Sequence, residues 1–153
     1  MRSKPSHDQG SRVATDHDAR PLPHQVVIPS DLGAARPVEE EILRQTDALG
    51  YDRACAFAIR LALEEAVVNA HKHGNKSDPA KRIFISYRID LQCVVLRIRD
   101  EGAGFDPARL PDCTAPDRIS LPCGRGIMLM REYMDEVSFN QRGNEVQLVK
   151  EKR

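Results

Sequence analysis

The chain has 153 residues, a length that suits one domain with a single hydrophobic core rather than two. Its 23 Lys and Arg residues balance its 23 Asp and Glu residues, so there is no overall basic field and no direct nucleic-acid binding is expected. The sequence lacks an apolar stretch of the roughly 18 residues that a membrane span needs, and its N-terminus lacks the apolar core of a secretion signal. We therefore expect a cytoplasmic protein that does not act at a membrane.

The first part of the chain predicts a tail followed by one domain. Residues 1–24 are polar, contain three prolines and hold few large apolar side chains. Burial of so little apolar surface does not offset the entropy lost on ordering. We predict a disordered tail at 1–24 and one folded domain at 25–153.

Within this domain, hydrophobic periodicity and turn residues predict five strands and three helices. Ile83, Ile85, Tyr87 and Ile89 alternate with mostly polar residues, which is typical of a half-buried strand. The expected elements are a strand at 25–28, helices at about 34–49 and 52–73, a hairpin of strands at 82–89 and 93–99, a helix from 126 to about 134, and a closing hairpin of strands at 136–140 and 144–150.

The order of these elements predicts the fold class. Hairpins, rather than regular alternation of strands and helices, favour an α+β two-layer sandwich. We expect a mostly antiparallel mixed sheet of about five strands, with about three helices on one face. Residues 106–123 contain four prolines and no clear periodicity, and we predict that they form a mobile lid.

Cysteine and histidine spacing argues against a structural metal site. The four cysteines are Cys55, Cys93, Cys113 and Cys123, without a C-x-x-C pair, so we predict free thiols rather than a zinc site or a disulfide framework. His71 and His73 are only two residues apart, and a helix would point them in different directions.

Two polar residues interrupt the second predicted helix. Glu65 and Asn69 are four residues apart, so a helix stacks them on one face about 6 Å from each other. The stripe that they interrupt is expected to face the core and contains Phe57, Ala58, Leu61 and Ala62. A buried carboxylate without a partner is costly, so this pair indicates an ion, a ligand or chemistry.

Two glycine-rich segments follow downstream. Asp100-Glu-Gly-Ala-Gly-Phe105 comes directly after a predicted strand, and Gly124-Arg-Gly-Ile127 opens a predicted helix. Backbone amides at a helix start favour a phosphate, so Gly124 and Gly126 are candidate phosphate-binding residues. Arg125 is a candidate for a charge contact, and Lys72 and Lys76 are weaker ones.

The order of these three segments resembles the ATP-binding domain shared by gyrase, the ninety-kilodalton heat-shock chaperone, histidine kinases and MutL. The resemblance runs from about Gln25 to Lys150 and implies this Bergerat-type fold. It also implies that ATP and Mg²⁺ are the cofactors. Each motif alone is weak evidence, but three in the right order at compatible spacing make a strong signal.

The resemblance implies a role for each site residue. Asn69 would be the magnesium ligand and Glu65 the general base. Glu64 is rotated by about 100 degrees around the helix, so it does not share the face of Asn69. Asp100 would accept a hydrogen bond from the exocyclic amine of adenine, and Gly102 and Gly104 would let backbone approach the nucleotide.

Within this superfamily the chain resembles the serine-protein-kinase anti-sigma factors. Met134-Asp-Glu-Val137 and Gly143-Asn-Glu-Val146 strengthen that match. A sensor histidine kinase would need a phospho-accepting helix hairpin upstream, and a gyrase, chaperone or mismatch-repair protein would need a further domain, which this short sequence is not expected to hold. The resemblance implies phosphorylation of a STAS-type antagonist, binding of a sigma factor, and a homodimer. A partner-switching module that binds ATP without transferring phosphate, and a plain ATPase, stay open as alternatives.

Overall fold

The computed structural model describes residues 20–104 and 125–153. The elements in chain order are strand β1 (His24–Pro29), the 3-10 turn η1 (Leu32–Ala35), helices α1 (Arg36–Ala48) and α2 (Arg53–Asn69), the π-helical turn η2 (Ala70–Gly74), strands β2 (Arg82–Ile89) and β3 (Cys93–Asp100), helix α3 (Arg125–Tyr133), and strands β4 (Glu136–Phe139) and β5 (Glu145–Glu151). Residues 1–19 of the predicted tail at 1–24, and the whole predicted lid at 106–123, lie outside the described residues.

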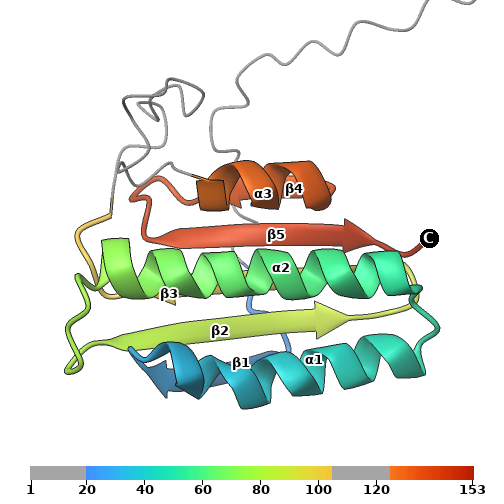
Figure 1. Ribbon diagram of the computed structural model, residues 1–153, viewed down its shortest axis with the longest axis horizontal. Coiled ribbons are helices and arrows are strands. Elements are labelled where there is room, and N and C mark those ends of the chain that lie inside the picture. The colour runs from blue at the N-terminus through green and yellow to red at the C-terminus, as the bar shows by residue number, and fades with distance from the viewer. Residues whose placement is uncertain (1–19, 105–124) are drawn as a thin grey trace, which may run out of the picture.

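The molecule has two layers, a sheet and a layer of helices (Figure 1). The strands follow the order β1-β2-β3-β5-β4, and α2 packs between α1 and α3 on one face of the sheet. These findings confirm the α+β class, and the described residues contain the predicted five strands and three helices. All four neighbouring pairs of described strands are antiparallel, so a mixed sheet was the wrong expectation for this part of the chain.

Helix α2 supplies the centre of the core. Asp52 caps its start by accepting a hydrogen bond from Cys55 N at 2.7 Å. The buried residues of α2 recur every three or four positions and face the sheet: Cys55, Ala58, Ile59, Ala62, Leu63, Ala66 and Val67. Phe57 was wrongly assigned to this face, since it is 56% exposed. Its ring meets that of Tyr133 edge-on, at 5.6 Å between centroids.

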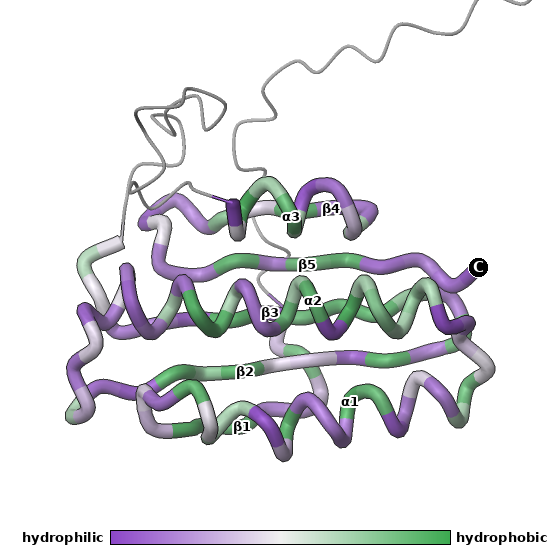
Figure 2. The backbone as a smooth tube through the Cα atoms, viewed as in Figure 1, coloured by the Kyte–Doolittle hydropathy of each residue, from purple (hydrophilic) through white to green (hydrophobic). Residues whose placement is uncertain are grey.

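The strands alternate as their sequences predict. Ile83, Ile85 and Tyr87 of β2 are buried against the helices, and Ile85 pairs directly with Ile98 of β3. In Figure 2 the middle of β5 is hydrophobic and its ends are hydrophilic, which matches burial of Val146 and Leu148 under the helix layer. The register places Ile83 opposite Asp100, so the end of β3 lies beside the start of β2.

Several element boundaries differ from the predicted ones, most of them by one or two residues, and the differences at two of them are informative. The second helix leaves α-helical geometry at Asn69 and continues as η2, which Asn75 N closes by donating to Ala70 O at 2.8 Å. At the other end, β1 begins at His24, and Leu22 before it is only 6% exposed. In addition, Arg97 of β3 donates a hydrogen bond to Arg20 O at 2.7 Å, a contact with the sheet that the polar composition of the tail did not indicate.

Candidate functional site

Glu65 and Asn69 lie one turn apart on the side of α2 that faces α3. Gly126, in the first turn of α3, packs directly against them. A Cβ on Gly126 would lie 2.8 Å from Glu65 Oε2 and 3.5 Å from Asn69 Oδ1, so a side chain at this position would displace the Glu65 carboxylate. The structure thus brings together three of the residues that the sequence singled out.

Asp100 ends β3 beside the C-terminal turn of the second helix. Its Oδ1 accepts a hydrogen bond from Gly102 N at 2.8 Å, and its carboxylate lies against Gly74, where an added Cβ would come within 2.2 Å of Oδ2. Burial raises the pKa of Asp100 above its usual value, although the Gly102 amide opposes the shift. The carboxylate is therefore held in place and partly shielded from water.

Gly102 and Gly104 are glycines because of contacts within the chain itself. A Cβ at Gly102 would lie 2.0 Å from Gly74 O, and one at Gly104 would lie 1.9 Å from Arg142 O. Gly104 also has a φ of +77°, a left-handed conformation that disfavours other residues. The structure explains both glycines by packing of backbone on backbone, whereas the sequence suggested approach to a nucleotide.

A cavity of about 220 Å³ connects these segments. Its apolar wall comes from the two layers of the core and includes Ala66, Ile98, Ile127, Met130, Phe139 and Val146. Its polar groups include Asn69, His73, Lys76, Asp100 and Asn144. An apolar hollow with a few convergent polar groups is typical of a small-molecule site. Partial burial lowers the pKa of His73, and the charges of Lys76 and Lys72 add to the effect.

The other predicted residues are distributed unevenly around this cavity. Arg125 is exposed at the start of α3, and it and Glu65 are not part of the cavity wall. Lys76 lines the cavity, while Lys72 is exposed and does not. Gly124 lies outside the described residues. Three of the residues in the predicted site therefore line the cavity: Asn69, Asp100 and Gly104.

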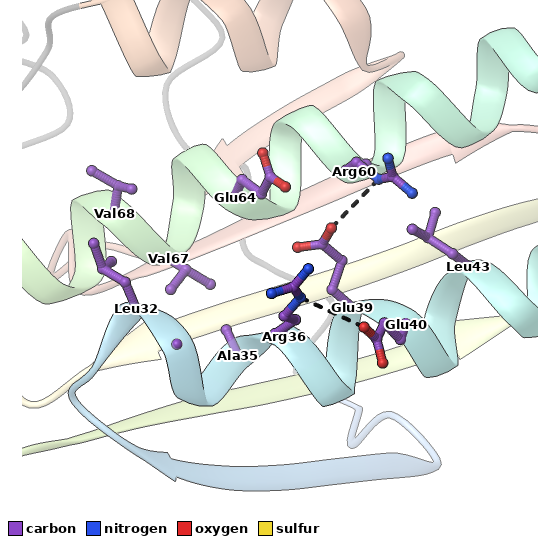
Figure 3. A pocket seen from close by; sticks show the side chains of 11 residues that line it. Leu32, Ala35, Arg36, Glu39, Glu40, Leu43, Arg60, Glu64, Val67 and Val68 are labelled. Carbon is purple, nitrogen blue, oxygen red and sulfur yellow. Dashed lines mark ion pairs between the residues drawn. The ribbon is translucent and has the colours of Figure 1, made fainter.

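Glu64 lines a second and larger hollow, of which Glu65 is not part. It has a volume of about 600 Å³ and lies between α1 and α2 (Figure 3). Glu64 lines it together with Glu39, which forms an ion pair with Arg60 at 3.5 Å. Burial raises the pKa of Glu39 to about 7, and the nearby Glu64 carboxylate adds to the shift. The two adjacent carboxylates therefore lie on different faces of α2, and only Glu65 lies beside Asn69.

The sequence did not predict some residues that shape the site. Gly74 was not among the predicted site residues, yet it packs against both Asp100 and Gly102. Asn144 O accepts from Asp100 N at 2.9 Å, and its side chain lines the cavity. No short-range pattern connects residues this far apart in the sequence, so no signal in one sequence would have found these contacts.

The donor set suits a hard cation held jointly with a ligand. Asn69 offers a carboxamide oxygen and Glu65 a carboxylate on the same face of α2. Among residues 20–104 and 125–153, no three His, Cys, Asp or Glu side chains gather in a metal-binding group. Cys55 and Cys93 are free thiols, as predicted, while Cys113 and Cys123 lie outside the described residues. Magnesium that keeps waters and phosphate oxygens needs only one or two protein ligands.

Comparison with protein families shows the family to which the chain belongs. Residues 28–150 match the family described as the histidine kinase-like ATPase domain. The chain belongs to this family. Membership confirms the superfamily resemblance drawn from the three motifs, and an ATPase domain implies ATP binding. In the described part of this family member, no helix is both long and apolar enough to cross a membrane.

The matching relatives include proteins named anti-sigma F factor. One from Anoxybacillus flavithermus is 37% identical over 98 residues, covering 60% of this chain and 66% of the relative. One from Geobacillus thermodenitrificans is 40% identical over 82 residues, covering 52% and 56%. One from Bacillus subtilis is 32% identical over 98 residues, covering 60% and 66%. The matched region thus spans less than two thirds of each of these relatives.

Two solved structures share the fold. The RsbU and RsbW domains of a Mycobacterium tuberculosis protein superpose with a TM-score of 0.54 at 17% identity, covering 85% of this chain and 32% of that one. The mycobacterial sensor histidine kinase MprB superposes with a TM-score of 0.51 at 18% identity, covering 84% and 99%. At these identities the similarity establishes the fold alone.

Proposed function

We propose that the chain is an ATP-dependent serine/threonine protein kinase of the anti-sigma-factor type. The observation that carries the proposal is the arrangement around the cavity of about 220 Å³. Asp100 lies in its wall, and so does Asn69, which packs with Glu65 under Gly126. A nucleotide lying along this cavity would have its base at Asp100 and its phosphates near Asn69 and the first turn of α3.

Each residue has a defined task in this proposal. Asp100 accepts a hydrogen bond from the exocyclic amine of adenine, a position at which guanine has an oxygen. Asn69 would ligate magnesium through its carboxamide oxygen, and the amides of Arg125 and Gly126 at the start of α3 would bind phosphate. Gly124, which precedes them in the sequence, is proposed for the same phosphate site. The bound magnesium would neutralise charge on the phosphates.

Glu65 is the proposed general base. It takes the proton of a serine or threonine hydroxyl as the oxygen of that hydroxyl bonds to the γ-phosphorus. The bond from that phosphorus to its bridging oxygen breaks, and ADP leaves with the bonding electrons. Glu65 is partly buried beside Asn69, which supports a position near the magnesium-bound phosphates.

The names of the relatives support the proposed partners. Anti-sigma F factors match over more than half of this chain. We infer that this chain binds a sigma factor and phosphorylates a STAS-type antagonist, acts in the cytoplasm and forms a homodimer. Sedimentation of the purified protein tests the dimer, and purification with sigma factors and STAS proteins of the same genome tests the partners.

Transfer of labelled γ-phosphate from ATP to such antagonist proteins tests the kinase. Wild type and Glu64→Gln should label a serine or threonine, whereas Glu65→Gln should not, since only Glu65 lies beside Asn69. The two variants remove the same charge from adjacent positions and are matched controls. Intact ATP binding without label on any protein would favour the partner-switching module, and release of free phosphate alone would favour a plain ATPase.

A further inference from the structure

Asn75 is a fully buried polar residue just outside the cavity. Its exposed fraction is 0%, and it follows η2 directly. Every polar atom of the residue is hydrogen-bonded: its backbone N donates to Ala70 O, and its backbone O accepts from Asp78 N. A buried amide satisfied this completely is rigid, because any movement leaves several groups without a partner.

The side chain of Asn75 joins three other segments of the chain. Its Nδ2 donates to Ser30 Oγ at 3.1 Å and to Arg82 O at 3.0 Å, and its Oδ1 accepts from Glu101 N at 2.9 Å. Those partners lie after β1, at the start of β2 and after β3. Asparagine suits this junction because a carboxamide offers two donors and an acceptor in one plane.

One of these contacts bears on Asp100. Glu101 N belongs to the peptide bond that joins Asp100 to Glu101, and Asn75 Oδ1 holds it in place. The next amide, Gly102 N, binds the carboxylate of Asp100 at 2.8 Å. Gly74, the neighbour of Asn75, packs against the same carboxylate. The turn at 74–75 therefore fixes both the backbone that follows Asp100 and one side of its carboxylate.

We propose that Asn75 is a positioning residue, which orients Asp100 for recognition of the nucleotide base by anchoring Glu101 N. This inference rests on the proposed binding of ATP in the cavity. Asn75 itself is not in the cavity wall. Its effect on base selection is exerted through Asp100.

Three variants separate positioning from general stability. Asn75→Ala removes the contact to Glu101 N, whereas Asn75→Asp keeps an oxygen that accepts from it. Ser30→Ala is the matched control: Ser30 is 3% exposed and bonds His71 Nδ1 at 2.9 Å as well as Asn75, but it does not touch Glu101. Thermal unfolding should show that Ser30→Ala and Asn75→Ala are both less stable than wild type.

Dissociation constants for Mg-ATP and Mg-GTP, measured by titration calorimetry, provide the decisive comparison. Asn75→Ala should lower the preference for ATP over GTP by about tenfold, because a misoriented acceptor no longer discriminates between the bases. Ser30→Ala and Asn75→Asp should keep that preference within about twofold, a change of about 0.4 kcal/mol. An unchanged preference in folded Asn75→Ala, or an equal loss in Ser30→Ala, would overturn the inference.

Hydrogen exchange of the Glu101 amide, measured without nucleotide, tests the anchor independently of ATP. The amide should exchange slowly in wild type and Ser30→Ala and rapidly in Asn75→Ala. Rapid exchange in wild type would overturn the anchor, whereas absence of ATP binding by wild type would overturn the proposed function instead. If Asn75→Ala does not fold, Asn75→Asp provides the test. Retained preference for ATP in Asn75→Asp would support the inference, whereas loss of that preference while the Glu101 amide stays protected would contradict it.

Discussion

Gly126 and Glu65 are so close that a single methyl group on the glycine would reach the carboxylate, at 2.8 Å from Oε2. The contact is to the end of a flexible side chain, so Gly126→Ala should fold and keep its thermal stability while displacing Glu65. We expect phosphate transfer to fall by at least about tenfold, or about 1.4 kcal/mol of activation free energy. Gly33→Ala is the control, because its added Cβ would make an ordinary 3.6 Å contact with Asp31.

Asn69→Ala should weaken the magnesium-dependent binding of ATP without preventing folding. The variant removes the proposed magnesium ligand, and we expect the affinity for Mg-ATP to fall by about a hundredfold or more, about 2.7 kcal/mol. Asn69 is only partly buried, so the free energy of unfolding should change by less than about 1 kcal/mol. Calorimetric titration with and without magnesium measures the effect, and an unchanged magnesium-dependent affinity would refute the assigned role.

Asp100→Asn should relax base selection. The amide keeps an oxygen that accepts from Gly102 N, but it adds a donor that is able to pair with the oxygen of guanine. ATP affinity should fall, GTP affinity should rise, and the ratio between them should shrink by about tenfold or more. Competition between the two nucleotides measures the ratio, while an equal loss of both would indicate damage to the fold.

Glu39 should make stability depend on pH. Its pKa is raised from 4.5 to about 7, so the folded protein binds a proton in this range that the unfolded chain releases. The contribution of Glu39 to the free energy of unfolding is therefore present at acidic pH. It is lost as pH rises through about 7, because the partly buried carboxylate then becomes charged. Glu39→Gln should therefore gain about 1 kcal/mol at pH 8, after allowance for solvent screening, and little at pH 5.

Urea unfolding at the two pH values measures the effect of Glu39→Gln. Glu40→Gln is the control because its side chain is 71% exposed in an ion pair with Arg36, so it should show no such pH dependence. A gain from Glu39→Gln that is the same at pH 5 and pH 8 would mean that the buried carboxylate stays charged throughout.

The sequence predicted the features that depend on short-range periodicity. Alternation at Ile83, Ile85 and Tyr87 set the strand and its buried face, because side chains of a strand alternate between two faces. The rotation between adjacent helical residues separated Glu64 from Glu65. Parts of the site that follow from these local rules were predictable, although the chemical role of Glu65 stays a prediction.

Long-range contacts were not predictable in this way. Asn75 meets Ser30 and Glu101 across 45 and 26 residues of sequence, and no periodicity encodes such a meeting. Phe57 was misassigned for a related reason. Helical spacing identifies which residues share a face, but the neighbouring helix decides how far that face is covered, and the Tyr133 ring covers Phe57 only in part.

Among the strands that the structure describes, β1 and β4 lie at the two margins of the sheet. β4 has only 4 residues, and β1 has 6 and ends in Pro29, which offers no backbone donor. Short or proline-terminated margins give an added strand little main-chain pairing and so guard against edge-to-edge aggregation. A strand added at either margin of the described sheet would therefore gain few main-chain hydrogen bonds.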